Sequence, residues 1–203
     1  MTPADHTVRA EPRSPGRPLS SELSDQLLTV AVDILADDGW GRLNSDRVAA
    51  RARAGKAGIY RRWPTMSALV RHAVSGFDLV PRPADTGSLR GDLLQLMQPW
   101  TRPLDRQERA VAGLVGAARH DDDLRAGLEA AVVRPLAGVV DELLDRAGAR
   151  GEAVTPVGRR LLGQLLLALW WDRYTAFAEP VPADELDALV DGALMPVLAV
   201  DAR

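Results

Sequence analysis

The segment from Asn44 to Leu69 constrains the fold of this 203-residue chain more than any other. Asn44 is a good N-cap for a helix from Ser45 to Ala52, and the residues 53–55 suit a tight turn before a second helix, Lys56 to Trp63. Pro64 then ends that helix, because proline lacks an N–H and its ring clashes in a helix interior. Two short helices joined by a tight turn predict a helix-turn-helix.

The charge of this segment favours nucleic acid as its partner. Residues 39–72 carry eight basic side chains and one acidic side chain, Asp46, so the local charge is 8 − 1 = +7, whereas the whole chain carries −3. Basic residues near the phosphates strengthen DNA binding, and the second helix of such a motif enters the major groove. The alternative is that the arginines only solvate a helix surface. Cap, turn, proline and charge agree within one window, so we favour DNA binding.

The second short helix has a predicted inner face and a predicted reading face. Ile59 and Trp63 are four residues apart and anchor the helix to the core. The opposite face combines small residues, which let the backbone approach the bases, with arginines suited to guanine and with groups suited to phosphate. We therefore expect the following residues at the DNA: Asn44, Arg47, Lys56, Ala57, Gly58, Tyr60, Arg61 and Arg62.

The rest of the chain also has a helical pattern, and it predicts an all-α protein of two domains. The expected helices span residues 20–38, 66–79, 87–101, 105–119, 121–147, 155–178 and 184–199, with Pro135 kinking or dividing the fifth of them. Residues 1–19 are expected to be a mobile arm, 20–72 a DNA-binding domain and 73–203 a second helical domain. The arm's Arg9, Arg13 and Arg17 suit a minor groove, but we favour an arm without DNA contact.

Several other classes of protein fit poorly. The chain has no cysteine, so disulfides and thiolate metal sites are excluded. No apolar run of signal-peptide length occupies the first twenty residues, and Leu161–Trp171 is too short to cross a membrane, so we expect a cytoplasmic protein. An aspartate-rich metal site would need a second acidic cluster at matching spacing, and the chain has none to accompany Asp121, Asp122 and Asp123. Capping of a helix start explains these three residues. We expect no enzyme, no catalytic or metal-binding residues and no cofactor.

The helix-turn-helix window resembles the DNA-binding domain of TetR-family transcriptional regulators. The run Gly58-Ile59-Tyr60-Arg61-Arg62-Trp63-Pro64-Thr65-Met66-Ser67-Ala68-Leu69 matches the family pattern in residue type and spacing. The resemblance implies that Lys56, Tyr60 and Arg61 lie at the DNA, with Tyr60 on a phosphate, and that Asn44 replaces a Thr or Ser that approaches phosphate. Three residues depart from the family pattern: Ser45, Arg53 in place of the turn glycine, and Met66 in place of a lysine. The departure at 53 either strains the turn or moves its left-handed residue to Gly55.

The family resemblance implies that the second domain dimerises and holds a small effector. Two helices carry the apolar residues expected at a four-helix dimer interface, although an internal core would also explain them. They are Leu161, Leu162, Leu165, Leu166, Leu169, Trp170 and Phe177 on one helix, and Leu186, Leu189, Val190, Ala193, Leu194 and Val197 on the other. The candidate effector-binding residues, which plain core packing would also explain, are Met97, Trp100, Leu114, His120, Trp171 and Tyr174.

These observations together predict a ligand-responsive transcriptional regulator. We expect a homodimeric repressor that binds a palindromic double-stranded DNA operator and is released by a small, largely apolar effector. The alternative is a helical effector-binding or protein-interaction module whose first domain has lost specific DNA recognition.

Overall fold

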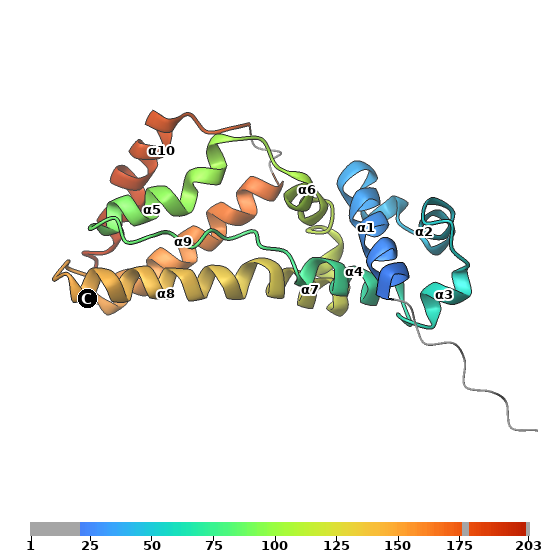
Figure 1. Cartoon of the computed structure of the whole chain (residues 1–203). Helices are drawn as coiled ribbons and strands as arrows, with labels where there is room; N and C mark the ends of the chain where they lie inside the picture. The colour runs from blue at the N-terminus through green and yellow to red at the C-terminus, as the bar shows by residue number, and fades with distance from the viewer. Residues whose placement is uncertain (1–20, 176–178, 202–203) are drawn as a thin grey trace, which may run out of the picture.

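The structure, a computed structural model, describes residues 21–175 and 179–201. These residues form helices and no strands, which confirms the all-α prediction. The predicted arm at residues 1–19, with its three arginines, and Phe177 lie outside the described residues. Figure 1 shows two parts side by side: a head made of α1–α4, and an elongated body made of α5–α11 with the C-terminus at its far end.

The head is built around one long helix. Its elements are α1 (Ser21–Asp38), the 3-10 turn η1 (Trp40–Arg42), α2 (Ser45–Arg51), α3 (Lys56–Tyr60) and α4 (Met66–Ser75). In α1 the buried residues Leu27, Ala31, Ile34 and Leu35 recur at helical spacing and face the other helices. Two of the predicted helices are shorter than expected. The helix α3 ends before Trp63, and α4 ends at Ser75, so Leu79 and Val80 are buried from an extended linker instead.

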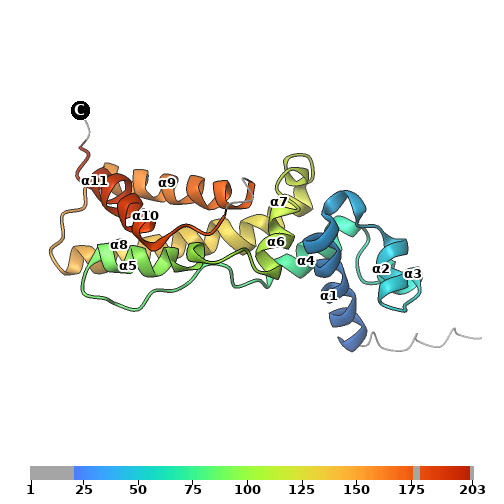
Figure 2. The same ribbon diagram turned by 90° about the horizontal axis from the view of Figure 1, so that it is seen from above.

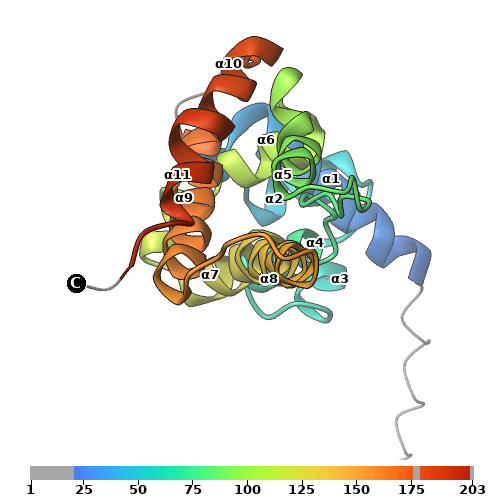
Figure 3. The same cartoon turned by 90° about the vertical axis from the view of Figure 1, so that its left-hand side faces the viewer.

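The body consists of α5 (Leu89–Met97), η2 (Gln98–Thr101), α6 (Arg106–Ala112), η3 (Ala117–Arg119), α7 (Asp122–Leu128), η4 (Glu129–Val133), α8 (Arg134–Ala149), α9 (Pro156–Thr175), α10 (Ala183–Leu189), η5 (Val190–Leu194) and α11 (Met195–Val197). The helix α9 contacts α6, α8 and α11, while α5 contacts α8, α10 and η5. Seen from above, α8 and α9 both extend along the body (Figure 2). In the end-on view α5, α8 and α9 surround the middle of the body, and α10 and α11 lie on its outer side (Figure 3).

Two segments of the body wind as π-helices, and each precedes a proline by two residues. The segment η4 is followed by Arg134 and Pro135, and η5 is followed by Met195 and Pro196. A proline in an α-helix lacks the N–H that would bond four residues back, and its ring collides with that carbonyl. A wider turn before the proline relieves the collision. The helix therefore continues through Pro135 by changing type, so it is not divided there, and the kink stays a prediction.

The head is joined to the body by close packing at two glycines. The helix α1 packs on α6, and α4 packs on α7. A Cβ atom at Gly113 would lie 2.8 Å from the Leu35 carbonyl oxygen, and one at Gly127 would lie 2.7 Å from Val74 Cγ2 and 3.2 Å from Arg71 Cα. The absence of a side chain at these two positions lets each body element approach the head closely.

Polar contacts reinforce both junctions. At the first, Arg106 bonds Asp33 at 2.5 Å and Asp37 at 3.2 Å. At the second, the Ser67 hydroxyl donates to Asp121 at 2.5 Å, and the N-terminal end of α7 is thereby fixed beside α4. Asp121 also caps α7 by accepting from the backbone N–H groups of residues 123 and 124.

Candidate DNA-binding and effector-binding sites

The first helix of the helix-turn-helix ends in a regular C-terminal cap with an unusual residue in it. Ala54 N–H donates to the Ala49 carbonyl at 2.9 Å and Arg53 N–H to the Ala50 carbonyl at 3.2 Å, which is the pairing of a Schellman motif. The left-handed position of this motif belongs to Arg53, with φ +49°, and not to Gly55, with φ −82°. Arg53 is the single non-glycine residue with positive φ in residues 21–175 and 179–201. The turn is therefore strained at Arg53, which is one of the two outcomes expected from the sequence; the other was a left-handed residue at Gly55.

Both predicted caps of the motif are confirmed. The Asn44 side chain accepts from the Arg47 N–H at 2.9 Å, so Asn44 begins α2. The Thr65 hydroxyl accepts from the Ala68 N–H at 3.0 Å and begins α4 directly after Pro64. Caps of this kind satisfy backbone donors that the first turn of a helix leaves unpaired.

The second helix, α3, is held by its last turn. Ile59 is fully buried, and Trp63 is buried just beyond the helix end. The Trp63 indole N–H donates to His72 Nδ1 of α4 at 3.0 Å, with the two rings edge-on. These contacts determine which side of α3 faces outward, because a five-residue helix has no stability of its own.

Four of the predicted DNA contacts share the outer face of α3, and two do not. Lys56, Ala57, Tyr60 and Arg61 are exposed, and Tyr60 keeps half of its surface accessible. The prediction for two further residues is wrong in orientation. Gly58 is buried against α1, and Arg62 turns inward, where its Nε donates to Ser24 Oγ at 2.8 Å and its Nη1 to the Gly58 carbonyl at 2.9 Å. A helix this short cannot anchor itself without also burying the residues beside its anchors.

Acidic residues hold part of the positive charge of the head. Lys56 forms an ion pair with Asp46 of α2, and Arg47 and Arg51 approach Asp38 at 2.7 Å and 3.6 Å. All five side chains are at least partly exposed, so each pair is weak and exchanges readily for another anion. Phosphate oxygens are the anions that this surface would meet on DNA.

The six candidate effector residues fall into four groups in the body. Met97 and Leu114 are fully buried core residues, and His120 is exposed at the surface. Trp171 lines an open cavity of about 700 Å³, together with apolar residues of η3, α7 and η4, and with Arg119 and Arg125. Trp100 and Tyr174 are buried inside the body. Of the six candidates, Trp171 alone lines this cavity, and contact of any of them with an effector stays a prediction.

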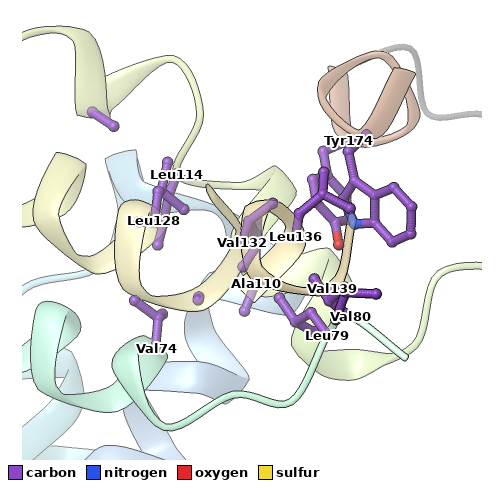
Figure 4. Close-up of a cluster of buried hydrophobic side chains, with 14 of the residues drawn as sticks. Val74, Leu79, Val80, Ala110, Leu114, Leu128, Val132, Leu136, Val139 and Tyr174 are labelled. Carbon is purple, nitrogen blue, oxygen red and sulfur yellow. The ribbon is translucent and has the colours of Figure 1, made fainter. Parts of the chain in front are cut away.

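Trp100 and Tyr174 belong to an aromatic cluster that also contains Trp170. The rings of Trp100 and Trp170 meet edge-on at 5.7 Å, and Arg173 lies 6.0 Å from the Trp100 ring. Figure 4 shows Tyr174 extending from α9 toward buried residues of α8 such as Val139. Burial raises the pKa of the Tyr174 hydroxyl, with the Glu108 carboxylate acting in the same direction and the Trp170 indole opposing it.

A buried ion pair adjoins this aromatic cluster, and the sequence patterns did not reveal it. Arg173 Nη2 approaches Glu108 Oε1 at 3.4 Å and donates to the carbonyls of Pro99, at 2.9 Å, and Arg102, at 3.2 Å. Glu108 also accepts from Arg102 and closes the capping box of α6 by accepting from the Asp105 N–H. The Asp105-x-x-Glu108 spacing signals the capping box, but nothing local to it indicates the arginine 65 residues away.

Two kinds of site are absent from the part of the chain that the structure describes. No group of three or more potential ligand side chains is arranged to hold a metal ion there. Asp121 caps α7, and Asp122 and Asp123 pair with Arg125 and Arg71 at 2.6 Å and 2.7 Å. Within the same residues, no helix combines the length and the apolar character needed to cross a bilayer.

Two family models match the chain, one over most of the head and the other over most of the body. Residues 27–73 match the model described as bacterial regulatory proteins, tetR family. Residues 83–193 match the model described as tetracyclin repressor-like, C-terminal domain.

Individual relatives are similar over nearly their whole length. A protein of Mycobacteroides abscessus named DNA-binding transcriptional repressor TetR is 33% identical over 183 residues, covering 89% of this chain and 96% of the relative. An uncharacterised HTH-type transcriptional regulator of Mycobacterium tuberculosis is 32% identical over 186 residues, covering 91% of this chain and 90% of the relative. A solved TetR-family transcription regulator is 28% identical with a TM-score of 0.56, covering 86% of this chain and 98% of that structure.

Proposed function

The chain belongs to the TetR family of transcriptional regulators, and on that premise we propose that it is a repressor released from DNA by a small effector. It would act in the cytoplasm as a homodimer on a palindromic operator. Residues 20–72 would bind DNA, and residues 73–203 would dimerise and hold the effector, which is largely apolar. The outer face of α3 carries this proposal, because it exposes Lys56, Ala57 and Tyr60 of the helix together with its C-cap residue, Arg61.

Each of these residues has a distinct part in the proposed complex. The small Ala57 allows the N-terminal end of α3 to come close to the base edges in the major groove. Lys56 would exchange Asp46 for a phosphate, and the Tyr60 hydroxyl would donate to a neighbouring phosphate. Arg61 has the reach and the donors to fork onto a guanine. Arg62 has a different part: it joins α3 to α1 and so orients the reading helix.

The apolar residues predicted for a dimer interface divide into two stripes on each helix. Leu162, Leu166 and Trp170 of α9 face the protein interior, as do Leu186, Val190 and Leu194 of α10 and η5. A second stripe stays partly or fully exposed: Leu161, Leu165 and Leu169 on α9, and Leu189, Ala193 and Val197 on the C-terminal helices. Two residues outside the predicted set, Ala168 and Trp171 of α9, are exposed or partly exposed beside this stripe. We propose that the second stripe, with these two residues, packs against its copy in a partner subunit, because a twofold interface joins identical surfaces.

Effector binding in the body would act on the head through the body helices that contact the head. The 700 Å³ cavity is lined by η3, α7 and η4, and α7 is also the helix that packs on α4. An effector releases DNA only if it binds the non-reading arrangement more tightly than the reading one. The shared helix provides a physical route for that difference in affinity.

A footprint of the purified protein on DNA flanking its own gene, at two salt concentrations, tests the DNA-binding proposal. We expect a protected, nearly symmetric site. Lys56→Ala should weaken binding and lower the salt slope by about one per half-site, whereas Arg82→Ala, an exposed arginine of the linker between head and body, should leave both unchanged. Salt-sensitive smearing without a protected site would favour the alternative, a module that has lost specific recognition.

Light scattering of purified variants tests the dimer. Ala168 and Ala149 are both exposed alanines in helices, but only Ala168 lies in the proposed interface. Ala168→Glu should give a monomer because it buries two like charges near the twofold axis, and Ala149→Glu should remain a dimer. A dimeric Ala168→Glu variant would show that the interface lies elsewhere.

A further inference from the structure

The aromatic cluster of the body contains an unusual concentration of unpaired hydrogen-bond donors. Among the described residues, five buried side-chain nitrogen or oxygen atoms lack a hydrogen-bond partner. Four of them belong to this cluster: Trp100 Nε1, Trp170 Nε1, Arg173 Nε and Tyr174 Oη. Each of the four side chains is at least 95% buried. Buried polar groups in folded proteins are almost always paired, so four together require an explanation.

The four groups lie close to one another although they come from two separate parts of the chain. Trp100 belongs to η2, and the other three belong to the last turns of α9. The two indole rings are 5.7 Å apart, Arg173 lies 6.0 Å from the centre of the Trp100 ring, and the Trp170 indole N–H lies near the Tyr174 hydroxyl. The aromatic rings provide flat apolar walls, and their polar edges provide the donors.

The cluster offers donors and almost no acceptors. Indole and guanidinium nitrogens only donate, and the Tyr174 hydroxyl also has a proton to give. The nearby acceptors are already used, because Glu108 and the carbonyls of Pro99 and Arg102 accept from other groups, Arg173 Nη2 among them. The two arginines, Arg102 and Arg173, are balanced by the two carboxylates, Glu108 and Asp105, so the preference for an accepting group comes from the unpaired donors and not from net charge.

We propose that these four donors are the polar part of the effector site and that they select an effector carrying a carbonyl or carboxylate oxygen on a compact aromatic or alicyclic body. This inference rests on the proposed function only in assuming that an effector exists. The oxygen accepts from the donors, and the apolar body lies against the indole and phenol rings. Trp171 lies between these four residues and the surface, because it lines the 700 Å³ cavity and its ring meets that of Tyr174 at 6.2 Å; on this proposal an effector enters past Trp171.

Calorimetry with four small probes of similar size tests the chemistry on the whole, DNA-free protein. Acetophenone and benzoate carry the accepting oxygen, toluene carries no polar group, and benzylamine carries only donors at neutral pH. We expect acetophenone or benzoate to bind at least tenfold more tightly than toluene and benzylamine, since one good hydrogen bond returns about a factor of ten. The stronger of the two identifies the oxygen as neutral or anionic. Binding of toluene or benzylamine at equal strength, or binding of no probe, overturns the proposal.

Variants that remove one donor while keeping an aromatic side chain give an independent test. Tyr174→Phe and Trp100→Phe should each weaken the binding of the better probe about tenfold. Without any probe, Tyr174→Phe should raise the melting temperature, because it removes an unpaired buried hydroxyl. Trp40→Phe, in the head, should leave probe binding unchanged. A lower melting temperature for Tyr174→Phe would mean that the hydroxyl is already satisfied in the free protein, and would overturn the proposal.

The two proposals fail in different ways. The operator footprint does not depend on the probes, and the probe titrations do not depend on DNA. A protein that protects its operator but shows no preference for the accepting oxygen would overturn the effector chemistry alone.

Discussion

Replacing Arg53 by glycine should stabilise the protein. The turn after α2 and the turn after α8 are the same Schellman motif: Glu152 N–H donates to the Ala147 carbonyl and Gly151 N–H to the Gly148 carbonyl, as their counterparts do at Arg53. The left-handed position is Gly151 in one turn, with φ +80°, and Arg53 in the other, with φ +49°. One motif therefore has the residue that the backbone prefers, and the other does not.

The size of the effect follows from this backbone difference. A left-handed conformation costs an L-residue about 1–2 kcal/mol, and glycine gives back roughly 0.4–1 kcal/mol through the greater freedom of its unfolded chain. The net gain for Arg53→Gly is therefore about 0.5–1 kcal/mol in the free energy of unfolding. For a chain of this length that corresponds to a rise of about 1–4 °C in melting temperature.

A matched variant separates the backbone effect from the loss of charge. Arg53→Ala removes the same charge but keeps a side chain in the left-handed turn, so it should be about 1 kcal/mol less stable than Arg53→Gly. Gly151→Ala should lose a similar amount in the other turn. Urea and thermal unfolding followed by circular dichroism measure all three. Equal stability of Arg53→Gly and Arg53→Ala would refute the reasoning, whatever either does relative to the unchanged protein.

Three further predictions concern charge, packing and pH. Asp46→Asn should raise DNA affinity about two- to fivefold in fluorescence anisotropy, because it frees its lysine partner for phosphate and removes a like charge from the DNA-facing surface. Gly127→Val should cost about 1–3 kcal/mol in unfolding experiments by forcing the head from the body, whereas Gly138→Val, which has open space around it, should not. The Ser67 hydrogen bond holds the pKa of Asp121 below its usual value, so this carboxylate stabilises the fold above about pH 4 and the stabilisation disappears as the pH falls through the lowered pKa. Melting temperatures of Asp121→Asn should therefore fall below those of the unchanged protein at pH 7 and approach them near pH 3.

Most of the head was predictable because its signals are local. Asn44 and Thr65 cap their helices within three residues of themselves, Pro64 ends a helix at its own position, and apolar spacing identifies α1. Such features need no knowledge of distant segments. The charge of the segment likewise follows from counting side chains, and it correctly indicated an exposed basic surface.

The failures have a common cause in tertiary packing. The inward positions of Gly58 and Arg62 depend on α1, about 38 residues away along the chain for the bond to Ser24. The donor cluster of the body joins residues of η2 and α9 that are about 70 positions apart, so no window of sequence contains it. Spacing alone also gave no indication of which tryptophan of the Trp170–Trp171 pair would be buried.

The π turn of residues 129–133 makes the placement of the head depend on a count of residues as well as on side-chain chemistry. A π turn holds one residue more than an α turn, and each residue of an α-helix advances the direction of the side chains by about 100°. If the same number of residues wound as an uninterrupted α-helix, α7 would be rotated by about that angle relative to α8. Gly127 would then no longer face α4. The head would lose this packing contact with the body, although none of the residues that form it had changed. The π turn therefore sets the direction of α7: deleting its extra residue would leave that direction nearly unchanged, whereas deleting a residue from the α-helical part of α8 would not.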